Sequence, residues 1–390
     1  MKIILFTNSL EGGGAERVAV TLANYWNQRH WQVTVVTLAA ADQDFYVLDP
    51  GVRRLALGLS GPSAGIVDAL RQNVRRIAAL RRVLLADRPA VAVAMMSTPN
   101  VLLALASRGI DGLAVVGSER CYPPHFPLSR FWAALRRRMY GRLDAVVALT
   151  QECARWIQAH SNAVRVPVIP NAVAWPLPQQ LPRLAPAAVC LPERKVLLAV
   201  GRLDAVKNYH VLIGVFAQLA DRHPDWDLVI LGEGPQRPAL EAAIAAGPAA
   251  ARIHLPGIAG NVAEWYARAQ LYVMSSHSEG FPNSLAEALA HGLPAVSFDC
   301  DTGPRDIIRH GLDGLLVPVE NADALARALD RLMGDAALRG EFAAHAREAR
   351  ERFSLERIVG MWESLFREVA GARMAPPGAD TRQLQERGKA

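Results

Sequence analysis

The sequence contains few cysteines, and they lie far apart. Its 390 residues include four, Cys121, Cys153, Cys190 and Cys300, and no two have the C-x-x-C spacing of zinc or redox sites. We therefore expect neither a zinc site nor a disulfide framework, and a reducing compartment such as the cytoplasm fits. No stretch reaches about 18 consecutive apolar residues, and the amino terminus has no signal-peptide core, so we expect neither a transmembrane helix nor a secretory leader.

Two common nucleotide-binding fingerprints are missing as well. Gly12, Gly13 and Gly14 follow the first strand-like run, but they form neither a G-x-G-x-x-G pattern nor a P-loop ending in Lys-Ser/Thr. The second strand-like run, 32–38, has no acidic residue at its end to hold a ribose, which disfavours a nicotinamide site. The glycines still fit two structures: a tight strand–helix turn, or a helix amino terminus that an anionic ligand approaches closely.

The sequence does have a regular alternation of strand-like apolar runs and helical patterns, which indicates parallel sheets built from β–α–β units. Prolines interrupt the alternation in 171–194, which predicts a semi-rigid linker. We expect an α/β protein with two domains, 1–170 and 195–352, facing each other across a cleft. A late helical pattern, 353–370, has an apolar face that must pack on something, with the first domain as the candidate, and 371–390 should be a disordered tail.

Basic residues are concentrated in the predicted first domain. Residues 1–170 carry 20 Lys and Arg against 11 Asp and Glu, whereas the whole chain has a net charge of +6. Arginines gather in two helical patterns, 66–85 and 128–143, beside apolar residues at helical spacing. Such patterns fit a helix packed on the core with a solvated outer face, and equally a helix that touches anionic lipid. Nucleic acid is disfavoured, because no recognised motif accompanies the charge.

The stretch 275–292 brings two carboxylates close to one strand. Glu279 lies in the loop after the strand-like run 271–274, and Glu287 lies about a turn and a half into the next helix, whose first turn Pro282 suits. Ligands bind at the carboxyl ends of strands in open α/β sheets, so both carboxylates and the free backbone N–H groups of the loop would face one crevice. A solvated surface carboxylate is the ordinary alternative.

Two cations follow the first strand of the predicted second domain. Arg202 and Lys207 flank a short loop that ends where a helical pattern begins. A guanidinium and an ammonium at this spacing suit a diphosphate, which gains negative charge as it leaves. Two unrelated surface cations are the alternative. Gly232-Glu233-Gly234-Pro235 forms a second turn on the same edge, and we expect it to be structural.

Taken together, these motifs resemble the retaining, GT-B-fold nucleotide-sugar glycosyltransferases of glycosyltransferase family 4. The resemblance extends from residue 1 to about 368, and its specific part is the Glu-x7-Glu spacing with the upstream Arg and Lys. It implies two Rossmann-like domains and an enzyme that moves a sugar, with retention, from a nucleotide sugar (UDP is expected) to a glycan or lipid-linked acceptor. The motif variants are most similar to bacterial members that build polysaccharides, lipopolysaccharide or lipid-linked oligosaccharides.

The resemblance also implies a role for each motif. Arg202 and Lys207 would bind the donor diphosphate and stabilise its charge, Glu279 would hold the donor sugar, and Glu287 would bind the ribose. Further donor contacts would come from the two loops, with backbone N–H groups contributing in the second, at Gly13, Gly14, Gly280, Phe281, Pro282 and Asn283. The leaving phosphate oxygen is thought to take the acceptor proton in such enzymes, so Glu279 need not be a nucleophile.

The sequence departs from the family at a histidine that many members carry after a first-domain strand. Here that strand, 113–118, ends in Glu119 and Arg120, which are the candidates for this position. The run Asp299-Cys300-Asp301 has the D-x-D pattern of metal-dependent transferases, but it stands one strand after the Glu pair. Since Arg202 and Lys207 would meet the phosphate charge, we expect neither a metal nor another cofactor.

Two other functions stay open. A related GT-B-fold epimerase or phosphorylase would use a similar cleft. An epimerase would need acid/base residues that cannot be located in the sequence, and a phosphorylase would need a cofactor lysine near the cleft. A non-catalytic nucleotide- or carbohydrate-binding protein would keep the cleft without turnover. The expected partners are the nucleotide sugar, the acceptor and, through the arginine-rich first domain, an anionic membrane surface at the cytoplasmic face of the inner membrane; nucleic acid is not expected.

Overall fold

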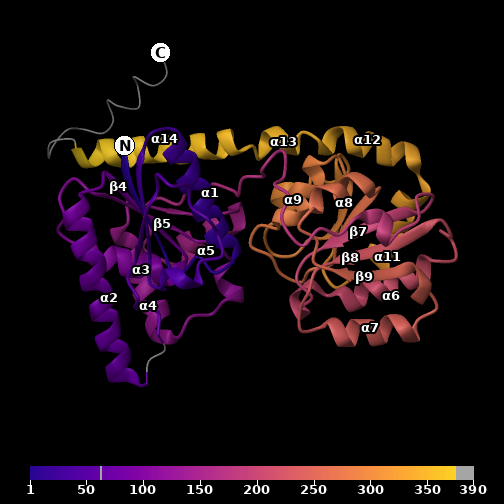
Figure 1. The fold of residues 1–390 in the computed structure, drawn as a ribbon, viewed down its shortest axis with the longest axis horizontal. Helices are drawn as coiled ribbons and strands as arrows, with labels where there is room; N and C mark the ends of the chain where they lie inside the picture. The colour runs from indigo at the N-terminus through magenta and orange to yellow at the C-terminus, as the bar shows by residue number, and fades with distance from the viewer. Residues whose placement is uncertain (62–63, 375–390) are drawn as a thin grey trace, which may run out of the picture. The chain divides into compact units, whose positions relative to one another are not determined.

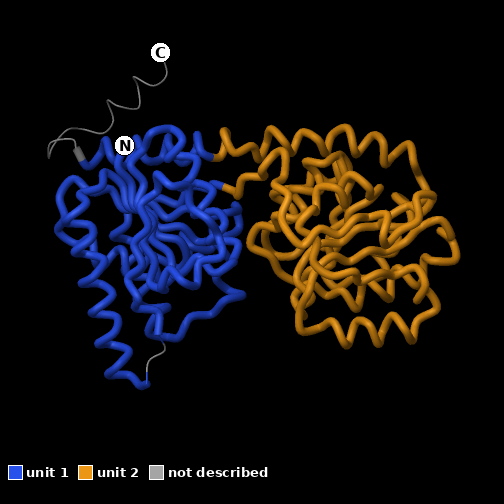
Figure 2. The backbone as a smooth tube through the Cα atoms, viewed as in Figure 1, with its two compact units in different colours: residues 1–169, 359–390 blue, residues 170–358 orange. Residues whose placement is uncertain are grey.

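The computed structural model describes residues 1–61 and 64–374. The chain divides into two compact units (Figure 2). Unit 1 contains Met1–Ile169 and the chain from Val359 onward, and unit 2 contains Pro170–Ile358. The chain therefore passes from one unit to the other twice.

Residues 171–194 differ from the linker predicted for them, because they belong to unit 2. The Asn261 side chain holds this segment: its Nδ2 donates to Leu184 O at 3.0 Å, and its Oδ1 accepts from Leu184 N at 2.9 Å. The Trp265 indole N–H donates to the same carbonyl at 2.9 Å. The prolines of this segment break the strand–helix alternation, but its backbone is fixed to unit 2 by these contacts.

Unit 1 is built on six parallel strands in the order β3-β2-β1-β4-β5-β6. Most of these strands are buried along their length, which explains their nearly continuous apolar sequences. The direction of strand addition reverses between β1 and β4, and ligands bind at such a switch point in open α/β sheets. The strands are β1 (Lys2–Thr7), β2 (Gln32–Thr37), β3 (Arg53–Ala56), β4 (Val91–Met95), β5 (Ala114–Ser118) and β6 (Ala145–Val147).

Helices follow most of these strands (Figure 1), and local sequence sets where they begin. For example, Thr150 Oγ1 accepts a hydrogen bond from Cys153 N at 3.2 Å, which caps α5. The helices of this part of unit 1 are α1 (Gly14–Gln28), α2 (Ile66–Asp87), α3 (Ser97–Ala106), α4 (Arg130–Met139) and α5 (Gln151–His160), with short 3-10 turns η1 (Ala41–Gln43), η2 (Pro123–His125) and η3 (Tyr140–Arg142).

Unit 2 repeats the same sheet topology. Its parallel strands have the order β12-β11-β10-β7-β8-β9, so the direction of strand addition reverses between β7 and β10. Side chains from β7, β8 and β11 form the core with α6 and α11. The strands are β7 (Lys195–Val200), β8 (Trp226–Leu231), β9 (Ile253–Gly257), β10 (Leu271–Met274), β11 (Ala295–Phe298) and β12 (Gly314–Val317).

The helices of unit 2 alternate with its strands and then continue alone. They are α6 (Tyr209–Leu219), α7 (Arg237–Ala246), α8 (Val262–Arg268), α9 (Asn283–Ala290), α10 (Pro304–Ile307), α11 (Ala322–Gly334), α12 (Ala336–Ala346) and α13 (Ala349–Arg352), with turns η4 (Pro186–Ala188), η5 (Ala205–Lys207) and η6 (Ala250–Arg252). The α/β class expected from the sequence is confirmed by these two parallel sheets and their helices.

The last described helix, α14 (Leu355–Met374), belongs to unit 1 from Val359 onward. Its Phe366 ring lies 5.3 Å from the Trp26 ring, and Trp26 stacks on Trp31 at 5.5 Å. The helix starts two residues later and ends four residues later than the predicted 353–370, so the first part of the predicted tail is helical. The remainder of that tail, 375–390, lies outside the described residues.

None of the helices within 1–61 and 64–374 combines the length with the hydrophobicity that crossing a bilayer would require.

Candidate functional site

The switch point of unit 2 is formed by the loops that follow β7 and β10. Two hydrogen bonds join these loops: Ser275 Oγ donates to Lys207 O at 2.8 Å, and His277 N donates to Val206 O at 2.9 Å. The two motifs singled out in the sequence, around Lys207 and around Glu279, are thus neighbours although 72 residues separate them. The parallel sheet brings the carboxyl ends of β7 and β10 to the same edge.

Lys207 and Glu279 form an ion pair at this edge. Lys207 Nζ lies 2.6 Å from Glu279 Oε1, and the two side chains are only 20% and 12% exposed. Ser276 Oγ donates to the same carboxylate oxygen at 2.7 Å. The sequence reasoning missed Ser276, whose signal was its place three residues before the first glutamate of the motif.

A glycine makes room for the lysine. A Cβ at Gly201 would lie 3.1 Å from Lys207 Cε and 2.8 Å from the Tyr209 hydroxyl oxygen. The aliphatic part of Lys207 therefore passes directly over the backbone at the end of β7. Gly232, at φ +146°, is equally constrained, since its Cβ would lie 2.0 Å from Gly201 O. This close backbone approach gives the Gly232–Pro235 turn the structural role expected for it.

Arg202 follows Gly201 and differs from Lys207 in its environment. Its side chain is exposed, and it makes no hydrogen bond or ion pair within the residues that the structure describes. An unpaired guanidinium carries five N–H donors and matches phosphate oxygens in geometry. The loop after β7 thus presents one cation held in place by a carboxylate and one cation that is open to a ligand.

Helix α9 positions the second glutamate of the motif. Glu287 is 8% exposed, and the Tyr266 hydroxyl donates to its Oε2 at 3.3 Å. Tyr266 comes from α8 and was missed in the sequence reasoning, because its contact with Glu287 depends on how α8 packs. The same hydroxyl lies 3.1 Å from Ser284 O, so Tyr266 ties the start of α9 to the glutamate.

The loop before α9 corrects two sequence-based expectations. The helix begins at Asn283, so Pro282 is its N-cap residue and lies just outside the first turn. Proline has no N–H, so the backbone donors of the predicted stretch are those of Gly280, Phe281 and Asn283. The Phe281 ring is buried 5.5 Å from the Phe353 ring, which leaves only its backbone for a ligand.

Two further contacts hold this loop. Asn171 Nδ2 donates to Asn283 Oδ1 at 2.9 Å. Gly303, at φ +103°, lies so close that a Cβ there would be 2.7 Å from Pro282 Cδ. Neither Asn171 nor Gly303 stood out in the sequence, since each acts from a loop far away along the chain.

The first aspartate of the D-x-D pattern is engaged in an ion pair. Asp299 Oδ1 pairs with Arg305 Nε at 2.9 Å, and the Cys300 side chain is buried. Among the described residues, metal-ligand side chains converge only at Cys190, Asp227 and His254, away from the switch point. There Arg194 Nη2 lies 2.6 Å from Asp227 Oδ1, so a guanidinium already neutralises the carboxylate.

The switch point of unit 1 contains the predicted glycine loop. Gly13 is the N-cap residue of α1, in an extended conformation, and a Cβ there would lie 2.1 Å from Glu16 Oε2. The Glu16 carboxylate thus lies over the amino end of its own helix. An anionic ligand at Gly13 or Gly14 would meet this carboxylate first.

Glu119 and Arg120 follow β5 and are buried in unit 1. Ser97 Oγ donates to both Glu119 carboxylate oxygens at 2.8 and 2.9 Å, and the Tyr140 hydroxyl also donates to Glu119 Oε1. Arg120 Nη1 donates to Ser118 Oγ at 3.3 Å, and burial lowers the pKa of Arg120 to about 10. The structure places both side chains in the interior, where Glu119 supports the turn between β4 and α3.

Glu119 makes the stability of unit 1 sensitive to pH. Burial raises the pKa of the Glu119 carboxyl, although the hydrogen bonds from Tyr140 and Ser97 oppose this. The contribution of the protonated Glu119 carboxyl to the free energy of unfolding is complete below the unfolded-state pKa, about 4.3. This contribution is lost as the pH rises through the higher folded-state pKa. Denaturant unfolding between pH 4 and 8 should therefore show the stability of wild type relative to Glu119→Gln falling as pH rises. If the unfolding free energies of wild type and Glu119→Gln depend on pH in the same way, this expectation is wrong. The control is Glu11→Gln, which removes an exposed carboxylate.

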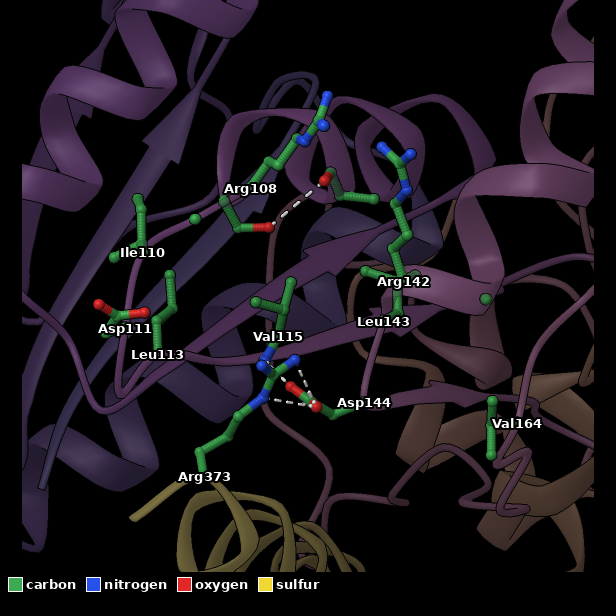
Figure 3. A pocket seen from close by; sticks show the side chains of 14 residues that line it. Arg108, Ile110, Asp111, Leu113, Val115, Arg142, Leu143, Asp144, Val164 and Arg373 are labelled. Atoms are coloured by element: carbon green, nitrogen blue, oxygen red, sulfur yellow. Dashed lines mark hydrogen bonds and ion pairs between the residues drawn. The ribbon is translucent and has the colours of Figure 1, made fainter. Parts of the chain in front are cut away.

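A cavity of about 480 Å³ lies at the opposite edge of the unit 1 sheet (Figure 3). It is lined by residues at the amino ends of β5 and β6 and by Arg373 of α14, which reaches Asp144 Oδ1 at 2.8 Å. Since ligands of open α/β sheets bind at the carboxyl edge, this cavity is not the candidate site. The Arg373–Asp144 pair instead attaches the end of α14 to unit 1.

Comparisons with known proteins cover both halves of the chain. The family described as "Glycosyltransferase Family 4" matches residues 12–174, and "Glycosyl transferases group 1" matches residues 189–349. A Campylobacter jejuni relative named GalNAc-alpha-(1->4)-GalNAc-alpha-(1->3)-diNAcBac-PP-undecaprenol alpha-1,4-N-acetyl-D-galactosaminyltransferase is 26% identical over 95% of this chain and 100% of its own. Exopolysaccharide phosphotransferase of Streptomyces coelicolor is 37% identical over 63% of this chain, which spans only 25% of that protein.

Solved structures with the same fold are also available for comparison. HepE from Anabaena, solved in complex with UDP, has a TM-score of 0.75 and 20% sequence identity over 94% of this chain and 99% of its own. At this identity the likeness concerns the fold. It covers most of both chains and confirms the GT-B fold expected from the sequence.

Proposed function

The chain belongs to glycosyltransferase family 4 and is a glycosyltransferase. We propose that it moves a sugar from a UDP-sugar to a hydroxyl group of a glycan or lipid-linked acceptor, with retention at the anomeric carbon. The observation that carries this proposal is the Lys207–Glu279 ion pair at the switch point of unit 2, with the exposed Arg202 on the same loop. Two similar proteins support the substrate classes: the Campylobacter relative is named for an undecaprenol-linked acceptor, and HepE was solved in complex with UDP.

In the proposed reaction, the bond between the sugar C1 and the diphosphate oxygen breaks as C1 bonds to the acceptor oxygen. The acceptor proton passes to the leaving phosphate oxygen, so no separate protein base is required. Arg202 and Lys207 stabilise the negative charge that develops on the diphosphate. Glu279 fixes the Lys207 ammonium and binds donor-sugar hydroxyls with its remaining acceptor capacity.

The rest of the donor is bound around α9. The Glu287 carboxylate, oriented by Tyr266, accepts hydrogen bonds from the ribose hydroxyls. Backbone N–H groups at Gly280, Phe281 and Asn283 contact the sugar and phosphate, helped by the amino end of the helix. Because two cations meet the diphosphate, the reaction proceeds without a metal ion or other cofactor. The protein acts in the cytoplasm, at the membrane face where its acceptor is held.

A panel of nucleotide sugars tests this proposal. The purified chain is incubated with UDP-, GDP- and ADP-sugars, and release of the nucleoside diphosphate is measured with and without EDTA. We expect slow UDP release from one UDP-sugar, unchanged by EDTA, and an acceptor product with the anomeric configuration of the donor by NMR. Release from GDP- or ADP-sugars alone would contradict the uridine assignment, and inversion would contradict retention. Tight nucleotide binding with no turnover of any donor would favour a binding protein.

A further inference from the structure

The amino-terminal half of α2 exposes the apolar side chains of its helical pattern. Ile66 is 90% exposed, Val67 82%, Leu70 63% and Val74 57%. At about 100° of rotation per residue, these four side chains lie within about 100° of the helix circumference. In the second half of the helix the pattern behaves as expected, since Leu80 and Leu84 are buried against unit 1.

This difference follows from where the helix lies. Figure 1 shows the amino-terminal end of α2 farther from the strands of unit 1 than its carboxyl-terminal end. The helix is 22 residues long, and no other described element of unit 1 buries the apolar side chains of its first two turns. One of the two interpretations of the sequence was a helix packed on the core with a solvated basic face. This interpretation accounts for the second half of α2 but not for the first.

The arginines of α2 fall into two groups. Arg76 and Arg81 are held by backbone carbonyls: Arg76 Nε donates to Leu59 O at 2.8 Å, and Arg81 Nη1 donates to Arg108 O at 2.6 Å. The second group is exposed and has no hydrogen-bond or ion-pair partner in the described part of the chain: Arg71, Arg75 and Arg82. The second group lies about 40–80° further around the helix than Val67, so the free guanidinium groups border the apolar stripe.

Among the described residues of α2, the carboxylate nearest this border is Asp68, one turn before Arg71. It is already engaged, because its Oδ2 accepts hydrogen bonds from Ala64 N at 3.0 Å and Gln72 Nε2 at 2.8 Å. Asp87 is at the other end, paired with Arg53 at 2.7 Å. An apolar stripe bordered by unpaired arginines matches a bilayer interface with anionic headgroups, where acyl chains and phosphates meet the two kinds of side chain at once.

We propose that the amino-terminal half of α2 is a docking surface for an anionic lipid bilayer. Ile66, Val67, Leu70 and Val74 enter the boundary between headgroups and acyl chains, and Arg71, Arg75 and Arg82 bind lipid phosphates. This inference goes beyond the proposed function, because it states how the protein reaches a membrane whatever sugar it transfers. Of the two arginine-rich helical patterns in the sequence, 66–85 and 128–143, the inference assigns membrane contact to the first.

Vesicle co-sedimentation of the full chain tests the docking surface. Vesicles of phosphatidylglycerol and phosphatidylcholine are compared with phosphatidylcholine alone, at low and high salt. Each arginine near an anionic surface contributes about fivefold in affinity, so Arg71→Ala, Arg75→Ala and Arg82→Ala together should weaken binding about a hundredfold. Val67→Ser with Leu70→Ser should weaken binding by about tenfold or more, and this loss should persist in high salt. The control is Arg130→Ala with Phe131→Ser, which changes an exposed arginine and an exposed aromatic residue on α4.

The outcomes separate this inference from the proposed function. Nucleoside diphosphate release without vesicles should be unchanged in every α2 variant, because none of these residues belongs to the candidate site. Equal binding of wild type and α2 variants to anionic vesicles, or no binding by either, would overturn the docking surface even if sugar transfer holds. Light scattering gives a further contrary result: a wild-type dimer that the α2 variants convert to a monomer would assign the stripe to a second copy of the chain. Vesicle binding that needs α2, with no donor turned over, would remove only the proposed function.

Discussion

Lys207→Ala is expected to lower kcat for sugar transfer about a hundredfold to a thousandfold, the usual effect of removing one fixed donor from a developing oxyanion. The Lys207 ammonium lies 2.6 Å from Glu279 and is therefore oriented before the donor binds. The diphosphate gains charge as the glycosidic bond breaks, so the loss should appear mainly in kcat and less in KM. Steady-state kinetics with the donor identified in the nucleotide-sugar panel measures it.

Two variants make this experiment specific. Lys207→Arg keeps the positive charge but not the ammonium geometry, and it should recover only part of the rate. Lys195→Ala removes a lysine from the other end of β7, where Lys195 pairs with Asp225 at 2.6 Å, and its kcat should match wild type. Thermal unfolding of each variant shows whether the partly buried Glu279, left without its partner, has destabilised unit 2. A Lys207→Ala enzyme that folds and keeps wild-type kcat would exclude the proposed role of this cation.

Phe366→Ala is expected to lower the free energy of unfolding of unit 1 by about 3–5 kcal/mol, the range for truncating a buried aromatic side chain. Phe366 has no exposed surface, and its ring lies 5.3 Å from Trp26, 6.5 Å from Trp31 and 5.7 Å from Trp362. Alanine would leave a cavity among three tryptophans, which cannot collapse without moving α1. Denaturant unfolding followed by tryptophan fluorescence measures the loss directly, because these indoles report on the packing.

The matched control is Met361→Ala. Met361 lies on the same helix and is 36% exposed, so its truncation should cost far less than that of Phe366. Equal losses for the two variants would mean that α14 is stabilised by its helical conformation and not by the aromatic contacts. Unfolding in two steps would itself be informative, since each unit has its own core.

The fold was largely predictable from the sequence, because nearly continuous apolar runs separated by helical patterns admit few arrangements other than parallel sheets. The family resemblance implied that Lys207 and Glu279 share a site, but the pattern of the sequence alone could not place them side by side. Their placement requires β10 to pair with β7, although β9 is the strand that precedes β10 in the chain. Ser276 had a local signal in its place before Glu279, whereas Tyr266 and Asn171 had none, because isolated polar residues carry no pattern until tertiary structure brings them to a motif.

Other failures have identifiable causes. The prolines of 171–194 mark the absence of regular secondary structure, and absence of strands and helices does not reveal whether a segment packs. The helical spacing of α2 indicates an apolar face, but spacing alone cannot tell whether a partner lies opposite that face. For Glu119, the sequence correctly placed the residue after a strand but could not indicate that its carboxylate points inward to Ser97 and Tyr140.

The route of the chain, out of unit 1 at Ile169 and back at Val359, has a consequence for recombination among relatives. A chimera made at a single junction near residue 170 would combine the amino-terminal half of one parent with an α14 from the other. The Trp26 and Trp31 face would then meet a foreign helix, and the Arg373–Asp144 pair would depend on both parents. The packing of unit 1 would therefore be preserved only in chimeras with two junctions, in which the final helix travels with the amino-terminal half.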